Sequence, residues 1–337
     1  MITAQYIIKS LFSAIGYQTG LFHLIQKGFY AEKAVVLMYH RVLSSLDDEK
    51  VFVQPGMYVT ENTFRQHMEV LKANFRILPL SELVFRLRNG REIGGCCAIT
   101  FDDGWLDNYL YAYPILKEFQ VPATIFLASS LIGSNKLFWP EELSYYLKQS
   151  DFRIKAGNGK IVIRLLKQLP EPKTEDQFLD QSIMQVKKWP LSERQELLDC
   201  LRVVFQRSTD HHRMLINWKE AQTMLKSGMV DFGAHTANHV ILDQVSAGVA
   251  QQEIQKSRDE IGHHLGIDVE LFSYPNGNFS PDLKQMVRKN RFKGAVTTQA
   301  AWVSKDTDLF AIPRIGIHED VSFSKQRFFS RLILKRF

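Results

Sequence analysis

The chain has 337 residues, of which 45% are hydrophobic and 23% charged, and its formal net charge is +6. These proportions are those of an ordinary globular protein that can bury a sizeable core, and they exclude an intrinsically disordered chain. The mild positive charge suits an anionic glycan or an anionic membrane surface. Without a basic stripe and interleaved aromatic residues it does not indicate nucleic-acid binding, so we expect no nucleic-acid partner.

Residues 1–32 predict an N-terminal amphipathic helical segment, in which polar residues such as Lys9 and Lys27 interrupt the apolar ones. The stretch 6–29 either packs against the rest of the protein or makes a peripheral contact with a membrane. The basic and apolar tail, residues 325–337, has the same two interpretations. Neither a clean signal-peptide core nor a run of about 18 apolar residues is found near the N-terminus.

The chain contains three cysteines, Cys96, Cys97 and Cys200, which are too few for a disulfide framework. Unpaired thiols favour a reducing compartment. We therefore expect the protein in the cytoplasm or on the cytoplasmic face of the inner membrane.

Strand-like apolar runs alternate with helical patterns from residue 33 to the C-terminus. This alternation predicts an α/β fold with a parallel sheet and right-handed crossovers, namely a distorted (β/α)7-type barrel over residues 33–337. The alternation is interrupted by an insertion at about residues 133–215. We expect helices there and a hairpin over Arg153–Leu165 that turns at Asn158-Gly159. The insertion is either a lid or substrate-binding subdomain, or a surface elaboration.

Two adjacent carboxylates, Asp102 and Asp103, follow the apolar run Cys96–Ile99 within the sequence Thr100-Phe101-Asp102-Asp103-Gly104. In parallel α/β folds, catalytic groups collect at the carboxyl ends of the strands. Asp and Gly are also common in turns for backbone reasons, so the pair alone admits a purely structural interpretation.

A pair of histidines, His235 and His239, follows the strand-like run Met229–Gly233. A spacing of four places two imidazoles on one face of a single helical turn, where both can point at one ion. Together with a carboxylate they make a facial ligand set that leaves positions open for water and substrate. The sequence therefore predicts a metal site.

Two further motifs are short strand-like runs. Phe272–Gly277 ends in a turn that contains Pro275 and Gly277, and Ile315–His318 ends in a histidine. With the Asp-Asp and His-His motifs, the sequence resembles the polysaccharide deacetylase family, which is the NodB-homology or carbohydrate esterase family four group. The resemblance covers roughly residues 33–135 and 215–320. It implies the NodB-type barrel and the metal-dependent hydrolysis of N-acetyl groups on a glycan, with release of acetate.

The resemblance also implies roles for individual residues. Asp102 is expected to be the general base, and His318 the general acid that protonates the departing amine. The backbone N–H of Tyr274 would stabilise the oxyanion. We expect a divalent ion, with zinc favoured over cobalt and nickel. The expected metal ligands are Asp103, His235 and His239, and the expected substrate-binding residues are His40, Pro275, Gly277 and Trp302, His40 being equally compatible with a structural role.

The sequence departs from the family pattern in three places, one of which is the insertion of about 80 residues between the Asp-Asp and His-His motifs. Ser273 stands where many members carry the Arg that holds the catalytic Asp, and Thr298–Trp302 keeps only the Trp of the segment that supports the late His. The opening Leu37–Val42 is similar to that of biosynthetic exopolysaccharide deacetylases, in which the third motif is often relaxed. The departures therefore suggest a subgroup of the family.

We expect an enzyme of exopolysaccharide, capsule or lipopolysaccharide biosynthesis that acts on an N-acetylated glycan, whose sugar is either lipid-linked or nucleotide-linked. Two alternatives remain open. One is an O-acetyl esterase or another C–N hydrolase on the same scaffold, because a fold does not fix the substrate. The other is a catalytically inactive carbohydrate-binding relative.

Overall fold

The computed structural model describes residues 4–44, 53–54, 56–149, 152, 159–171, 174–206 and 213–334. The chain divides into two compact units. The first comprises Met1–Leu46, Tyr58–Ser134 and Leu215–Phe337, and the second Asp47–Met57 and Asn135–Met214. The second unit overlaps the insertion that we predicted at about 133–215, but it also contains Asp47–Met57, which lies outside that prediction.

The first unit is built on an eight-stranded sheet in which every pair of neighbouring strands is parallel. The order is β10-β1-β5-β6-β7-β8-β9, with β4 paired to the start of β5. Apolar residues fill both faces of the strands, as is typical of parallel sheets covered by helices. The strands are β1 (Val35–Tyr39), β4 (Arg76–Ile77), β5 (Cys96–Phe101), β6 (Ala123–Leu127), β7 (Val230–Ala234), β8 (Leu271–Ser273), β9 (Gly294–Val296) and β10 (Ile315–Gly316).

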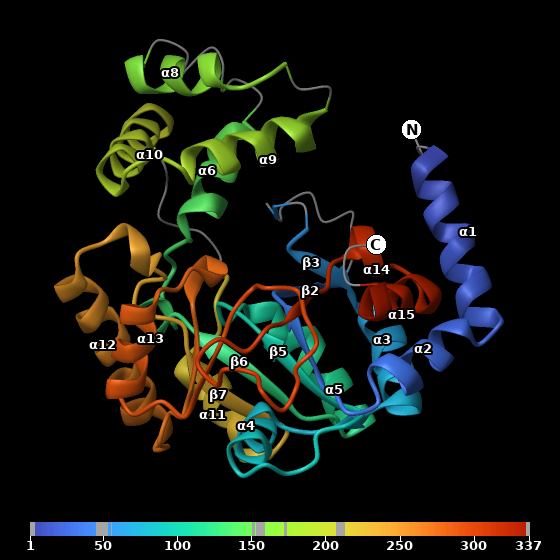
Figure 1. Ribbon diagram of the computed structural model, residues 1–337. Coiled ribbons are helices and arrows are strands. Elements are labelled where there is room, and N and C mark those ends of the chain that lie inside the picture. Colours follow the sequence, from blue (N-terminus) through green and yellow to red (C-terminus); the bar gives the residue numbers. More distant parts are fainter. Residues whose placement is uncertain are drawn as a thin grey trace. The chain divides into compact units, whose positions relative to one another are not determined.

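Helices connect successive strands and surround this sheet (Figure 1). A separate two-stranded sheet pairs β2 (Arg41–Leu43) with β3 (Tyr58–Thr60). The alternation confirms the predicted parallel α/β barrel architecture. The helices of this unit after the N-terminal segment are α3 (Glu61–Asn74), α4 (Leu80–Arg88), a π-helix (Asn108–Ala112) continued by α5 (Tyr113–Phe119), α11 (Trp218–Lys226), α12 (Ala247–Leu265), α13 (Pro281–Lys289), α14 (Glu319–Ser322) and α15 (Lys325–Leu334).

The segment 312–316 contacts both ends of the strand order. Ile312 bridges Val296 of β9 in parallel orientation, and Ile315 pairs with Leu37 of β1. The amide of Arg314 donates to the carbonyl of Gln299. The last strand therefore links the two edges of the sheet and curls it toward a barrel.

The N-terminal segment forms two helices, α1 (Ala4–Gln18) and α2 (Leu21–Phe29), which pack on α15. Phe22 is buried against Gly16, where a Cβ atom would lie 2.4 Å from the Phe22 ring. This close approach explains the glycine in α1. Among the described residues, none of the helices combines the length and hydrophobicity of a membrane-spanning helix.

The second unit is helical and has its own apolar core. The predicted hairpin is wrong for residues 160–165, which lie in α8, and the turn residue Asn158 lies outside the described residues. Val162 and Leu165 of α8 are buried three residues apart, so the short apolar run that resembled a strand is one face of a helix. The helices are α6 (Trp139–Leu147), α8 (Lys160–Gln168), α9 (Glu175–Val186) and α10 (Leu191–Phe205).

His67 of α3 is fully buried beneath the C-terminal helices. Its Nε2 lies 2.7 Å from the carbonyl of Ser322, its Nδ1 lies 3.1 Å from the hydroxyl of Tyr39, and its ring stacks on Phe328 at 3.8 Å. Burial lowers the pKa of His67 to about 3, against a smaller opposing effect of the hydrogen bond to Ser322. The folded protein therefore contains a neutral imidazole at this position.

We predict that His67 makes the protein less stable as the pH falls from about 6.5 towards 3. In that window the unfolded chain binds a proton that the folded chain does not bind, so folding becomes less favourable. At pH 5 the loss attributable to this residue is about 2 kcal/mol relative to pH 7.5. Urea denaturation at the two pH values measures it. His67→Gln should show the smaller decrease, whereas His263→Gln, on the exposed side of α12, should behave like the wild type.

Candidate active site

The polar residues singled out in the sequence follow the carboxyl ends of five parallel strands, which meet at one edge of the sheet. The strand ends contribute, in chain order, His40 after β1, Asp102 and Asp103 after β5, His235 after β7, Tyr274 after β8 and His318 after β10.

Asp103 sits in a left-handed turn that aims its carboxylate into the site. Asp103 has φ 77° and Gly104 has φ 81°. A Cβ atom on Gly104 would lie 2.7 Å from Leu127, so only glycine fits there. Trp105 donates its indole N–H to Oδ2 of Asp103 at 3.0 Å. The positive φ of a non-glycine residue is a strained geometry of the kind that clusters at functional sites.

His235 is buried and has one defined tautomer. Its Nδ1 lies 2.7 Å from the carbonyl oxygen of Ser273, and only an N–H can donate to a carbonyl. Nε2 therefore carries the lone pair, and it lies 3.5 Å from Oδ1 of Asp103. Burial lowers the pKa of His235 to about 4, so the ring is neutral at pH 7. This is the protonation state that a metal ligand requires.

His239 reaches the same carboxylate oxygen, with its Nε2 3.2 Å from Oδ1 of Asp103. The predicted helical turn is wrong: residues 235–239 form a loop in which Thr236 and His239 have φ 60° and 56°. Thr236 accepts from the amide of Val240, and Glu253 of α12 accepts from Asn238. The loop, rather than helical periodicity, brings the two imidazole rings to 4.9 Å between centroids.

Asp103, His235 and His239 offer one ligand atom each, all within 4.8 Å of one another. Oδ1 of Asp103 is buried, and no hydrogen-bond partner with adequate geometry was found for it among the described residues. Burial by itself raises the pKa of Asp103, but the contact with His239 and the charges of the surrounding histidines hold it well below the ordinary value. An ionised oxygen facing the Nε2 atoms of two imidazoles fits a divalent metal ion.

Asp102 is held by Arg314, a residue that the sequence analysis did not identify. Nη1 and Nη2 of Arg314 donate to the two carboxylate oxygens of Asp102 at 2.8 and 2.7 Å. Burial has the largest single effect and raises the pKa of Asp102, but the charge and hydrogen bonds of Arg314 together with the charges of His235 and His40 outweigh it and leave the pKa lowered. The carboxylate is therefore ionised and fixed in orientation, as a general base requires.

The guanidinium of Arg314 is fully buried and lies in a polar cage. It donates Nε to the carbonyl of Thr297, Nη1 to the hydroxyl of Thr100 and Nη2 to the hydroxyl of Ser273, each at 3.0 Å. Ser273 thus occupies the place where many family members carry an Arg, and it supports an Arg that comes from the segment directly before β10. The sequence offered no motif for this exchange, because 212 residues separate Arg314 from Asp102.

His318 has a carboxylate partner that we expected to be missing. Its Nδ1 lies 3.2 Å from Oδ2 of Asp320, two residues further along the chain at the start of α14. The hydrogen bond from His318 lowers the pKa of Asp320. The charge support therefore comes from the local sequence and not from the segment Thr298–Trp302.

The predicted oxyanion donor is engaged elsewhere. The amide of Tyr274 donates to the carbonyl of Val296 at 3.3 Å, because the pairing of β8 with β9 continues one residue beyond the strand. Pro275 and Gly277 form a short turn after it, and both are buried. A Cβ atom on Gly277 would lie 2.1 Å from Thr298, which explains the glycine. A substrate contact by these two residues stays a prediction.

The structure places Trp302 away from the strand ends, contrary to the predicted role in substrate binding. Its indole N–H donates to the carbonyl of Leu332, and its ring stacks on Tyr30 at 4.2 Å. Trp302 is therefore a core residue beneath the N- and C-terminal helices. His40, in contrast, is close enough to the site for the charges of Asp103 and Asp102 to raise its pKa, although burial has the larger effect and lowers it.

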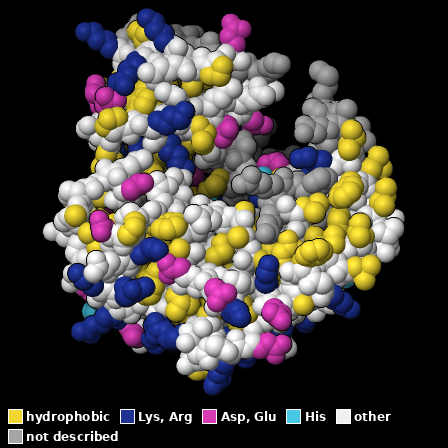
Figure 2. All heavy atoms as spheres, in the orientation of Figure 1, with side chains coloured by type: hydrophobic (Ala, Val, Ile, Leu, Met, Phe, Trp, Pro, Cys, Tyr) yellow, Lys and Arg dark blue, Asp and Glu magenta, His cyan; other side chains and the backbone are white. Residues whose placement is uncertain are grey.

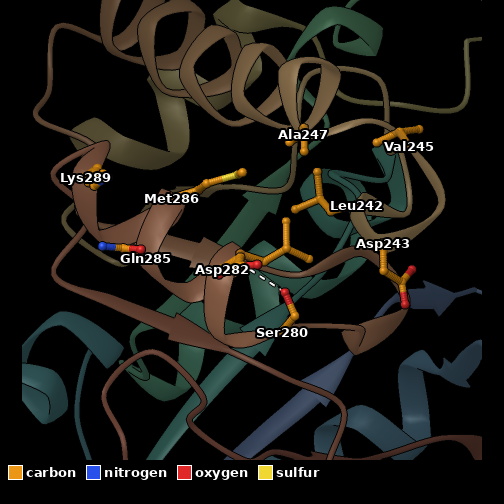
Figure 3. A pocket seen from close by; sticks show the side chains of 11 residues that line it. Leu242, Asp243, Val245, Ala247, Ser280, Asp282, Gln285, Met286 and Lys289 are labelled. Atoms are coloured by element: carbon orange, nitrogen blue, oxygen red, sulfur yellow. Dashed lines mark hydrogen bonds between the residues drawn. The ribbon is translucent and has the colours of Figure 1, made fainter.

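A separate hollow of about 440 Å³ opens between the start of α12 and α13 (Figure 3). It contains none of the residues described above. Asp243 on its rim accepts from Asn278 at 2.7 Å, which connects it to the loop after Gly277. Its lining consists of Leu242, Asp243, Val245, Ala247, Ala250, Ser280, Asp282, Leu283, Gln285, Met286 and Lys289.

Comparison with known proteins agrees with this geometry. The family model for polysaccharide deacetylase matches residues 89–161 and 193–295. A poly-beta-1,6-N-acetyl-D-glucosamine N-deacetylase of Staphylococcus epidermidis is 23% identical over 308 residues, which are 85% of this chain and 80% of that protein. The relative of the same name from Staphylococcus aureus strain N315 is 21% identical over 305 residues, which are 85% of this chain and 79% of that protein.

Solved structures show the same fold. The Streptococcus pyogenes deacetylase PplD, determined in complex with acetate, superimposes with a TM-score of 0.58 at 19% identity, over 89% of this chain and 98% of that one. IcaB from Ammonifex degensii superimposes with a TM-score of 0.57 at 18% identity, over 88% of this chain and 97% of that one.

Proposed function

The chain belongs to the polysaccharide deacetylase family, and from this membership and the site geometry we propose that it removes N-acetyl groups from a glycan and releases acetate. The observation that carries the proposal is the pairing of a facial Asp-His-His set with an adjacent, Arg-oriented carboxylate, Asp102. A binding protein has no use for a fixed, ionised base beside a metal site. Relatives named as N-deacetylases of poly-beta-1,6-N-acetyl-D-glucosamine make exopolysaccharide synthesis the favoured setting.

Asp103, His235 and His239 would hold the divalent ion, and zinc is the favoured identity because two imidazoles and one carboxylate are a common catalytic zinc set. A bound ion of this kind lowers the pKa of water and polarises a carbonyl oxygen. Cobalt and nickel remain the alternatives. His235 is oriented for this role by its hydrogen bond to Ser273.

The remaining residues divide the proton transfers. Asp102, held by Arg314, takes a proton from the attacking water. His318, which is partly exposed and paired with Asp320, gives a proton to the departing amine. His40 faces the same carboxylates and is assigned to contact the substrate. These assignments follow the positions of the side chains at the strand ends.

We further propose that the glycan is lipid-linked and that the enzyme works on the cytoplasmic face of the inner membrane. Three free cysteines, two of them buried in β5, support a reducing compartment. A lipid-linked substrate would bring the enzyme to a membrane, and the N-terminal helices carry apolar side chains suited to such contact.

Acetate release from poly-β-1,6-N-acetylglucosamine oligomers tests the proposed reaction. The wild type should release acetate, and Asp102→Asn should lower the rate by a factor of about 100 or more, since general-base catalysis contributes on this scale. O-acetylated oligomers measured in parallel distinguish an esterase. Release from the ester alone would replace N-deacetylation by ester hydrolysis, and release from neither, with metal bound, would favour a carbohydrate-binding protein.

A further inference from the structure

The helices α1 and α2 expose a continuous set of large apolar side chains. On α1 the exposed residues Ile8, Leu11, Phe12 and Ile15 follow helical spacing and share one face. On α2, Leu21, Leu24 and Phe29 are exposed, the last two at 69% and 78%. Figure 2 shows hydrophobic side chains gathered over these two helices, along the right-hand edge of the view. Exposed apolar patches of this kind mark interaction sites.

The inner face of the same helices is firmly attached to the protein. Ser13 donates to Ser330 of α15 at 3.0 Å, His23 stacks on Phe329 at 4.6 Å, and the hydroxyl of Tyr30 donates to the carbonyl of Ile333. Small and polar groups thus face the protein at Ser13, while isoleucine, leucine and phenylalanine face solvent. Apolar side chains also face the protein, since Phe22 is fully buried and Tyr17 and Ile25 pack against the core. The helices therefore present a second apolar face to solvent, in addition to the one that a surface helix usually packs on the core.

The charges on the two helices themselves are positive. Residues 4–29 contain Lys9 and Lys27 and no Asp or Glu, and Lys27 is exposed on α2. Carboxylates lie outside the two helices: Glu32 is exposed after α2, and Glu69 of α3 pairs with Lys325 of α15. Apolar side chains beside an exposed lysine complement a bilayer with anionic headgroups.

We propose that the exposed face of α1 and α2, made of Ile8, Leu11, Phe12, Ile15, Leu21, Leu24 and Phe29, docks on the surface of an anionic phospholipid bilayer. Of the two segments with a predicted membrane contact, α15 is excluded as the inserting one, because Phe328, Phe329, Leu332 and Ile333 are buried. The purpose of the docking rests on the proposed function, because docking would hold the catalytic unit where a lipid-linked glycan is presented. The binding itself is measurable without substrate.

Sedimentation with phospholipid vesicles tests the proposal. The full chain should bind vesicles of phosphatidylcholine containing phosphatidylglycerol, and more weakly vesicles of phosphatidylcholine alone. Leu11→Glu combined with Ile15→Glu should weaken binding by about tenfold or more, because affinity scales with the apolar area that enters the interface. Lys27→Glu should weaken binding only to the anionic vesicles.

The matched control is Val203→Glu, which changes a side chain of the second unit that is 78% exposed, as Phe29 is. It should bind like the wild type. Circular dichroism verifies that each variant is folded. Acetate release from soluble oligomers is measured separately, so that failure of the docking proposal can be distinguished from failure of the catalytic proposal.

Two outcomes overturn the proposal. The first is equal vesicle binding by the wild type and the Leu11→Glu/Ile15→Glu variant, or no binding by either. The second is a dimer of the wild type in light scattering that the same variant converts to a monomer, without vesicle binding by either form, which would make a second copy of the chain the occupant of this face.

Discussion

Replacing Arg314 with methionine is expected to lower kcat/KM for acetate release by about 100-fold or more, because a carboxylate displaced by about 1 Å loses its productive position. The metal content should stay at the wild-type level, since Arg314 contacts Asp102 and none of the three metal-ligating side chains. Rate measurements and elemental analysis of the same preparation check both expectations. The fall should appear in kcat more than in KM, because Asp102 acts in the reaction and not in glycan binding.

Loss of Arg314 also leaves Asp102 buried without its cation, which costs about 3–5 kcal/mol of stability. Leu71→Ala, a truncation of a fully buried side chain in α3, serves as the control because it destabilises by a similar amount without touching the site. If Leu71→Ala retains activity while Arg314→Met does not, instability alone is excluded. Arg314→Lys keeps the charge but not the two-pronged hydrogen bond, and it should be intermediate.

A double exchange tests the geometry more directly. Ser273→Arg combined with Arg314→Ser returns the guanidinium to the position at which many family members carry it. The exchange is feasible because the side chains of Ser273 and Arg314 are hydrogen-bonded to each other in this chain. Partial recovery of kcat relative to Arg314→Met is the expected result. Full activity of Arg314→Met by itself would show that the base needs no such partner.

His239→Ala is expected to abolish metal binding and to reduce acetate release by about 1000-fold or more, since an ion at such a site contributes several kcal/mol to transition-state stabilisation. His239 is the most informative ligand to remove. Its side chain is 21% exposed, against 6% for Asp103 and 3% for His235, so its truncation disturbs the fold least. About one ion per chain in the wild type and almost none in the variant, measured by elemental analysis, is the predicted pair of values.

Two comparisons make the metal measurement specific. Asp102→Asn should retain the ion but not the activity, because Asp102 lies next to the ligand set without belonging to it. Reconstitution of the metal-free protein with zinc, cobalt or nickel identifies the ion that supports catalysis. Wild-type protein that takes up none of the three would contradict the site.

The strand ends of the site were predictable from the sequence because a local sequence pattern marks each of them. The apolar run Cys96–Ile99 precedes Asp102, and the strand-like run Met229–Gly233, which includes Asp231, precedes His235. Parallel strands then bring these ends to one edge. Local patterns therefore located the proposed metal ligands.

Features that depend on long-range packing were not predictable. Arg314 is an unremarkable residue between Pro313 and Ile315 until the curled sheet brings it to Asp102. The loop around His239 depends on Glu253 of α12, and a spacing of four residues cannot distinguish such a loop from a helical turn. Trp302 matched a motif by type, but the packing of Tyr30 against it determines its place.

The position of Arg314 directly before the last strand has a consequence for the order in which the protein matures. Chains are synthesised from the N-terminus, and Asp102, Asp103, His235 and His239 all emerge before residue 312. The segment that joins β9 to β1 is also the one that delivers the guanidinium to Asp102. A nascent chain thus possesses all three proposed metal ligands before the proposed base has its partner, and the proposed site is complete only when the sheet closes.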